Sequence, residues 1–130
     1  MQRLILIIDD EVSIRKFLQF HLDKNYRVIT MESGKEALIW LNEGNFPDVI
    51  VTDINMPFVD GKLVIKELKS QKLTNAIPII VMSANSNGWG CAECLEVGAE
   101  DFILKPIDPF DLQQKIKEII SRGAIFGNAI

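Results

Sequence analysis

Five short apolar runs, separated by amphipathic segments, constrain the fold of this chain more than any other feature of its sequence. The runs span residues 4–8, 26–30, 49–52, 77–82 and, more weakly, 101–104. Several of them are apolar at every position rather than at every second one, which is typical of parallel strands covered by helices on both faces. Strict alternation of such strands with helical patterns predicts an α/β domain with right-handed crossovers.

The segments between the apolar runs carry the periodicity and the end signals of helices. Apolar and aromatic residues repeat along one face of the first segment: Ile14, Phe17, Leu18, His21 and Leu22. On this stripe His21 is interpreted as a packing residue. The second segment opens with the capping box 33–36, and the last opens with Asp108-Pro109, an N-cap followed by proline at the first helical position.

The fourth helix has the weakest signal, because glycines at 88 and 90 each cost about 1 kcal/mol relative to alanine in a helix interior. We therefore expect this helix to begin late or to fray at its N-terminus, and to end at Gly98. The five strands and five helices together predict a flavodoxin-like, doubly wound parallel sheet with strand order 2-1-3-4-5. Ligands of such sheets bind at the carboxyl ends of the strands.

Length and composition favour a single domain without a membrane segment. The chain has 130 residues and a formal net charge of −4. We expect one domain over residues 1–122 and a short tail over 123–130, too short for an output domain. No apolar run approaches the roughly 18 residues of a membrane span, and no secretory signal is recognisable. These observations predict a cytoplasmic protein that binds neither membranes nor, given its acidity, nucleic acid directly.

Ionisable and polar residues follow four of the five predicted strands: Asp9, Asp10 and Glu11, then Asp53, then Ser83, and finally Lys105. Carboxylates that converge repel one another by a few kcal/mol at an effective dielectric constant of about 20. A hard divalent cation such as Mg²⁺ compensates them best. Because Lys105 and Ser83 can hold phosphoryl oxygens, the pattern indicates Mg²⁺-assisted phosphoryl transfer with an aspartate nucleophile.

Together these residues resemble the receiver domain of response regulators in two-component signalling, over about residues 3–122. The matching residues are Ile8-Asp9-Asp10-Glu11, Asp53, Met56-Pro57, Gly61, Ser83-Ala84, Gly98-Ala99, Phe102 and Lys105-Pro106. Each piece alone is common in proteins. All of them in order, each at the end of the expected element, are specific.

The resemblance implies a phospho-accepting regulatory domain rather than an enzyme. Asp53 would take a phosphoryl group from a phosphohistidine of a sensor kinase or phosphotransfer protein. Asp9, Asp10 and Asp53, with the backbone carbonyl of Asn55, would hold Mg²⁺, with Asp10 as the direct ligand of the acidic pair. Lys105 would pair with the phosphoryl oxygens. Ser83 would donate a hydrogen bond to them.

The resemblance also implies a conformational switch. Ser83 would move toward the phosphoryl group, and Phe102 would turn inward behind it. This shift would remodel the face formed by the fourth helix, the fifth strand and the fifth helix. That face would be read by a downstream protein, which the sequence does not identify, or by a second copy in a phosphorylation-linked homodimer. A cis Lys105–Pro106 bond is implied as well.

The same sequence argues against three other functions. A flavin-binding module needs a hydroxyl- and glycine-rich phosphate loop after the first strand, whereas Asp9, Asp10 and Glu11 would repel a phosphate. Phosphatases of the haloacid dehalogenase type carry a DxD motif after the first strand, whereas Asp53 follows the third strand. A partner-binding pseudo-receiver is disfavoured by the intact Asp53, Lys105 and acidic pair.

Two features near the fourth helix have no assigned role. Cys91 and Cys94 have CxxC spacing, but no histidine or third ligand lies near them, which favours packing over redox or metal chemistry. Trp89 lies between two glycines and is either a buried plug or an exposed anchor for a partner. The sequence does not separate these two interpretations.

Overall fold

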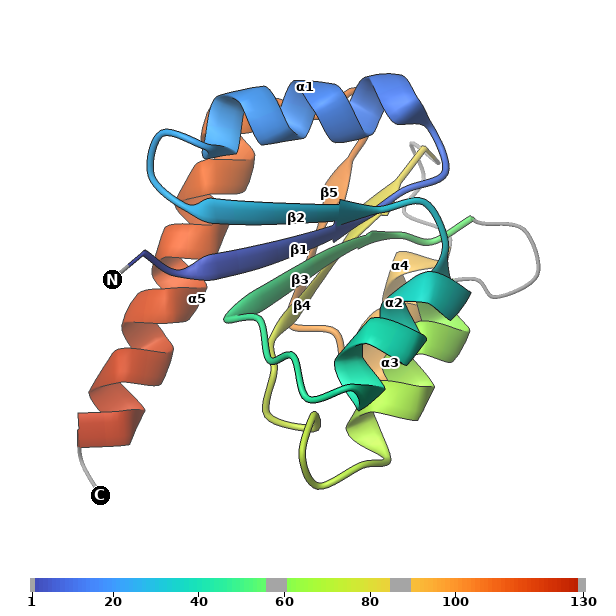
Figure 1. Cartoon of the computed structure of the whole chain (residues 1–130), viewed down its shortest axis with the longest axis vertical. Coiled ribbons are helices and arrows are strands. Elements are labelled where there is room, and N and C mark those ends of the chain that lie inside the picture. The colour runs from blue at the N-terminus through green and yellow to red at the C-terminus, as the bar shows by residue number, and fades with distance from the viewer. Residues whose placement is uncertain (1, 56–60, 85–89, 129–130) are drawn as a thin grey trace.

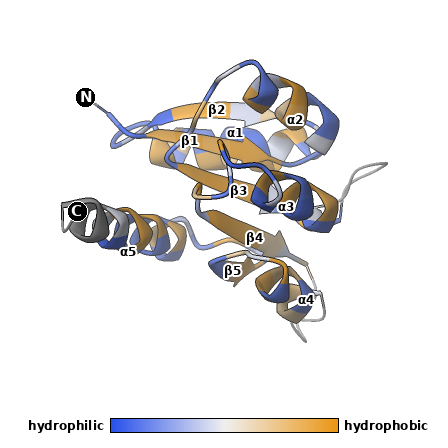
Figure 2. Ribbon diagram, turned by 90° about the horizontal axis from the view of Figure 1, so that it is seen from below, coloured by the Kyte–Doolittle hydropathy of each residue, from blue (hydrophilic) through white to orange (hydrophobic). Residues whose placement is uncertain are grey.

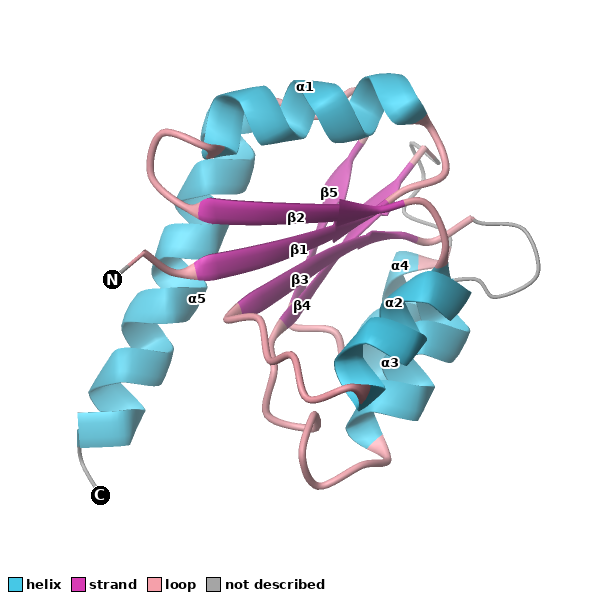
Figure 3. Cartoon of the chain, in the orientation of Figure 1, coloured by secondary structure: helices cyan, strands magenta, loops and turns pink. Residues whose placement is uncertain are grey.

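The structure, a computed structural model, describes residues 2–55, 61–84 and 90–128, and of residues 124–128 the backbone alone. Within these ranges, five strands alternate with five helices (Figures 1 and 3). The strands are β1 (Leu4–Ile8), β2 (Arg27–Met31), β3 (Val49–Asp53), β4 (Ile79–Ser83) and β5 (Asp101–Leu104). The helices are α1 (Val12–Leu22), α2 (Gly34–Asn42), α3 (Gly61–Lys69), α4 (Cys91–Glu96) and α5 (Pro109–Asn128).

The strands form one parallel sheet in the order β2-β1-β3-β4-β5, which confirms the predicted topology. The ends of the strands lie within two residues of the predicted ones. The largest difference is at β4, which begins at Ile79 rather than at residue 77. Pro78 explains it, because proline cannot donate a hydrogen bond to the strand ladder.

Helices cover both faces of the sheet (Figures 1 and 2), and a hydrophobic cluster lies on each face. Helices α1 and α5 pack on the face that includes Ile5 and Ile7. Helices α2, α3 and α4 pack on the opposite face, which includes Leu6 and Ile8. Successive side chains of a strand point to opposite faces, so an uninterrupted apolar run supplies both clusters.

The ends of the helices follow the predicted signals. The Ser33 hydroxyl accepts a hydrogen bond of 3.2 Å from the Glu36 amide at the start of α2. Asp108 Oδ1 accepts one of 2.9 Å from the Phe110 amide at the start of α5. As expected, α4 begins late, at Cys91 after a left-handed Gly90, and ends at Glu96, shortly before the left-handed Gly98.

Several details differ from the predictions or extend them. Phe17 lies on the predicted apolar stripe but is exposed, because α1 turns this side away from the sheet; its ring lies 4.6 Å from that of His21. The backbone of residues 123–128, predicted as a tail, continues α5 as helix, and the domain boundary at 122 stays a prediction. Cys91 and Cys94, interpreted from the sequence as packing residues, are both buried.

Some predictions concern residues outside the described ranges. These are the Met56-Pro57 pair, Gly88 and Trp89. Among the described residues, no helix combines the length and the apolar composition needed to cross a membrane.

Candidate functional site

The parallel sheet brings the predicted site residues to one edge. Asp9 follows β1, Asp53 ends β3, Ser83 ends β4 and Lys105 follows β5. Asp9 stays in line with the sheet because its amide donates a 3.1 Å hydrogen bond to the carbonyl of Met31. The order of strands makes β1, β3, β4 and β5 neighbours, so residues far apart in the sequence become adjacent here.

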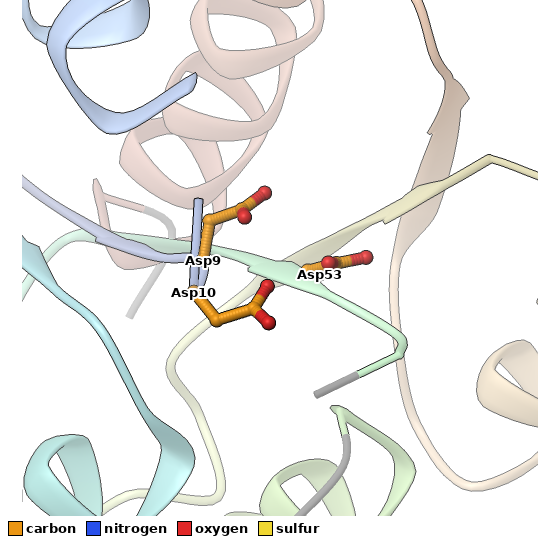
Figure 4. Close-up of side chains that lie close together, drawn as sticks. All are labelled: Asp9, Asp10 and Asp53. Carbon is orange, nitrogen blue, oxygen red and sulfur yellow. The ribbon is translucent and has the colours of Figure 1, made fainter. Parts of the chain in front are cut away.

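Three carboxylates form a cluster at this edge. One oxygen atom from each of Asp9, Asp10 and Asp53 lies within 4.8 Å of the others. In Figure 4 the three side chains project to the same side of the strand ends. Asp9 is 0% and Asp53 5% exposed, whereas Asp10 is exposed to solvent. The cluster is therefore two buried carboxylates with a third at their solvent side.

Lys105 is the cation of this cluster. Its Nζ lies 3.1 Å from Asp9 Oδ2 and 3.3 Å from Asp53 Oδ2, and its side chain is 13% exposed. Glu11 Oε1 is more distant, at 4.0 Å. The Lys105 amide donates a 2.7 Å hydrogen bond to the carbonyl of Ser83, and the Lys105–Pro106 peptide bond is cis. The ammonium balances one of the three negative charges, so the fully ionised cluster remains anionic.

The three carboxylates differ in the partners they already have. Asp9 Oδ1 accepts a 2.9 Å hydrogen bond from the Glu11 amide, while Oδ2 contacts Lys105. Asp53 Oδ1 accepts a 3.4 Å hydrogen bond from the amide of Asn55, which places the exposed Asn55 beside this carboxylate. The Asp10 side chain has no hydrogen bond or ion pair with another described residue. Of the three acids, Asp10 therefore has the carboxylate oxygens most available to coordinate a cation.

Burial and charge act against each other on the ionisation of this cluster. Burial raises the pKa of Asp53; Lys105 acts to lower it, and the Asp9 carboxylate raises it further. Burial acts to lower the pKa of Lys105, but Asp53 and Asp9 outweigh it, so the pKa of Lys105 is raised overall. Lys105 is accordingly a permanent cation at neutral pH.

The two predicted switch residues lie on the neighbouring strands β4 and β5. Ser83 is buried at the end of β4, in register with Leu104 of β5. Phe102 is half-buried in β5 and packs against the cluster under α2, α3 and α4. Gly61 is buried at the start of α3, where its amide donates a 2.9 Å hydrogen bond to the carbonyl of Ile54.

Sequence reasoning missed Arg15, which reaches this loop from α1. Its Nη1 donates a 2.7 Å hydrogen bond to the main-chain carbonyl of Asp9. A signal was present in the sequence, because helical side chains lean toward the N-terminus and a first-turn arginine can reach the preceding loop.

An apolar recess of about 400 Å³ opens beside the site. It is lined by Ser13, Ile14, Phe17, Lys105, Pro106 and Ile107. A larger hollow of about 530 Å³ lies between Tyr26 and Phe110, against α5, and contains none of the carboxylates of the cluster. Of these two hollows, the apolar recess is the one lined by a residue of the acidic site, Lys105.

Fold and acidic edge are those of a receiver-type signalling domain, and comparison with known proteins agrees. Residues 5–117 match the family described as response regulator receiver domain. The chain belongs to this family.

Named relatives and solved structures support the assignment. The alkaline phosphatase synthesis transcriptional regulatory protein PhoP of Bacillus subtilis is 39% identical over 126 residues, covering 96% of this chain and 51% of that protein. The response regulator SaeR of Staphylococcus aureus is 38% identical over 119 residues, 91% of this chain and 50% of SaeR. The chain thus spans about half the length of these relatives. A putative response regulator from Chloroflexus aurantiacus superposes with a TM-score of 0.88 at 30% identity, covering 93% of this chain and 99% of that one.

Lys105→Met is expected to lower the free energy of unfolding by about 3 kcal/mol at neutral pH without metal, since it leaves two buried carboxylates without their cation. The pKa of Lys105 is raised above its unfolded value, so its contribution is fully present below the unfolded value and is lost as pH rises through the folded pKa. Urea unfolding in EDTA measures the effect.

A matched control is Lys115→Met, which removes a more exposed ion pair of 3.3 Å with Asp101. We expect a loss of at most about 1 kcal/mol for that variant. Equal losses for the two lysines would show that Lys105 does not stabilise the buried acids.

Proposed function

We propose that this domain is a phospho-accepting switch in which Asp53 takes a phosphoryl group from a phosphohistidine of a sensor kinase or phosphotransfer protein. The observation that carries the proposal is the contact of Lys105 with two buried carboxylates, Asp9 and Asp53, beside the exposed Asp10. A lysine held between two acids is well placed to follow the new negative charge when one of them is phosphorylated.

The chemistry of the donors fits Mg²⁺. The cluster offers carboxylate oxygens alone, which suits a hard cation that retains several waters. Asp9, Asp10, Asp53 and the backbone carbonyl of Asn55 would hold the ion, with Asp10 as the direct ligand because its side chain has no other described partner. When bound, Mg²⁺ would neutralise charge on the phosphoryl oxygens.

The protein groups would then share the transfer as follows. An oxygen of Asp53 forms the new P–O bond as the P–N bond breaks, and the imidazole leaves with the bonding electron pair and is protonated. Lys105 pairs with the phosphoryl oxygens, and Ser83 donates a hydrogen bond to one of them. The domain turns over no separate substrate, so it acts as a regulatory acceptor rather than as an enzyme.

The proposed readout begins at Ser83 and Phe102. Phosphorylation changes the charge at Asp53 from one negative charge to nearly two, which attracts the Ser83 hydroxyl. Phe102 would then turn inward and remodel the face of α4, β5 and α5. A downstream protein, or a second copy of the domain, would bind the remodelled face.

The donor protein would approach the solvent side of the cluster. The apolar recess between α1 and the loop after β5 includes Lys105 and would accept apolar side chains beside the phosphohistidine. Because the chain spans about half the length of its relatives, the proposal concerns this domain and is compatible with a further domain in the whole protein. The receiver itself would occupy residues 1–122 and act in the cytoplasm.

Incubation with acetyl phosphate tests the proposal without knowledge of the cognate kinase. With Mg²⁺ we expect the mass of the intact chain to increase by about 80 Da, the mass of one phosphoryl group, whose oxygens carry nearly two negative charges in place of the one on the carboxylate. The same incubation with EDTA is expected to leave the mass unchanged. Labelling that persists in EDTA would exclude the metal-assisted mechanism, and no labelling in Mg²⁺ would favour a pseudo-receiver.

A further inference from the structure

We propose that Arg15 is a positioning residue that holds the loop after β1 in the conformation that binds the cation. The inference rests on the proposed function, because it concerns the Mg²⁺ site of that function. Its basis is the 2.7 Å hydrogen bond from Arg15 Nη1 to the main-chain carbonyl of Asp9. Arg15 itself contacts none of the proposed metal-binding carboxylates by hydrogen bond or ion pair among the described residues.

Asp9 is restrained at four points, and Arg15 supplies the one that also restrains Asp10. The Asp9 amide is held by Met31, Oδ1 by the Glu11 amide and Oδ2 by Lys105. These three contacts position the strand end and the Asp9 carboxylate. The fourth contact, from Arg15, holds the Asp9 carbonyl oxygen.

Peptide planarity transmits this contact to Asp10. The carbonyl of Asp9 and the Cα atom of Asp10 belong to one planar peptide unit, so fixing the oxygen fixes the direction in which Asp10 leaves the strand. The Asp10 side chain has no described partner of its own. Its position near Asp9 and Asp53 therefore depends on the backbone that carries it.

The local sequence explains why an arginine can do this. Helix α1 begins at Val12, so Arg15 lies in its first turn, and its amide donates a 3.2 Å bond to the carbonyl of Glu11. Helical side chains lean toward the N-terminus, and a guanidinium is charged at all relevant pH values. The resulting charge-assisted bond is stronger than one between neutral groups.

An electrostatic role and a positioning role of Arg15 predict opposite changes in Mg²⁺ affinity when Arg15 is removed. A cation near a Mg²⁺ site repels the ion, so a purely electrostatic role predicts that removing Arg15 tightens Mg²⁺ binding. The positioning role predicts the reverse. Residues that orient metal ligands typically contribute about 10-fold or more to metal affinity.

The experiment is isothermal titration of the whole chain with MgCl₂ for wild type and three variants. For Arg15→Ala we expect the Kd for Mg²⁺ to rise about 10-fold. Arg15→Lys keeps the charge and can restore part of the bond, so we expect a value between those of wild type and Arg15→Ala. Lys16→Ala is the charge-matched control, since Lys16 is the next residue of α1 and is exposed. We expect it to change the Kd by less than about 2-fold, as for a screened surface charge.

A metal-free readout separates positioning from a general loss of structure. In EDTA, hydrogen exchange of the Glu11 amide, which donates a hydrogen bond to Asp9 Oδ1, is expected to be faster in Arg15→Ala than in wild type, while exchange in the core strands is unchanged. An unchanged or lower Kd, or unchanged exchange of the Glu11 amide, would overturn the inference. If Asp53 is labelled in the wild type but Arg15→Ala leaves the Kd unchanged, the role of Arg15 is overturned and the proposed function stands. A wild type that binds Mg²⁺ with this dependence on Arg15 but accepts no phosphoryl group would instead remove the proposed function.

Discussion

Asp53→Asn is expected to lower phosphorylation by acetyl phosphate at least about 100-fold, because an amide oxygen is a far weaker nucleophile than a carboxylate oxygen. The substitution also replaces one of the three carboxylates of the acidic cluster by a neutral amide. We expect the intact mass to stay unchanged over a time course in which the wild type is fully labelled. Raising the Mg²⁺ concentration is not expected to restore labelling, since the acceptor itself is missing.

The same substitution is expected to leave the fold at least as stable as in the wild type when no metal is present. Burial raises the pKa of Asp53, with Asp9 adding to the effect and Lys105 opposing it. An acid whose folded pKa is raised contributes stability below its unfolded value, and this contribution is lost as pH rises through the folded pKa. At neutral pH the ionised carboxylate therefore carries a penalty that asparagine removes.

Thermal unfolding in EDTA checks this expectation, and a lower midpoint for Asp53→Asn would contradict it. Asp101→Asn serves as the labelling control, since Asp101 is a partly exposed acid that pairs with Lys115. We expect this control to be phosphorylated like the wild type. Undiminished labelling of Asp53→Asn would instead point to Asp9 or Asp10 as the acceptor.

Gly61→Ala is expected to lower the free energy of unfolding by about 3 kcal/mol, the upper range for forcing an added carbon into a packed site. A Cβ atom at this position would lie 2.5 Å from the carbonyl oxygen of Asp53 and 3.0 Å from Cα of Ile54. Both contacts are with backbone, which cannot rotate away as a side chain can. The Gly61 amide also donates a hydrogen bond to the Ile54 carbonyl, so relief of the clash would break that bond.

Urea unfolding measures this loss, and phosphorylation kinetics measure its effect on the site. The clash displaces the backbone of Asp53, so we expect Gly61→Ala to be labelled more slowly even where it remains folded. Gly123→Ala is the matched control, because a Cβ at that position of α5 meets nothing within 4 Å. We expect that variant to gain up to about 1 kcal/mol, the difference in helix propensity between the two residues. Similar effects at the two glycines would contradict the steric explanation.

Local patterns explain why most of the fold was predictable. Uninterrupted apolar runs are typical of strands buried on both faces. Leu6 and Ile7, which are adjacent in β1, accordingly belong to hydrophobic clusters on opposite faces of the sheet. Helix ends followed from Ser33, Asp108 and Pro109, whose effects are confined to one turn. The pattern was a poorer guide for Phe17, because periodicity shows which residues share a face and not how much of that face a neighbour covers.

The sequence by itself determined the strands, the helix ends and the set of residues that meet at one edge of the sheet, since these depend on periodicity, short end signals and the geometry of parallel strands. The strand order followed from the flavodoxin-like class that the alternation of strands and helices predicts. Only the tertiary structure decided how the members of that set are paired. It placed Lys105 between Asp9 and Asp53, left the Asp10 side chain without a described partner, and brought Arg15 back onto the Asp9 carbonyl. Such pairings depend on distances of a few ångströms between side chains from different elements, and no local pattern encodes them.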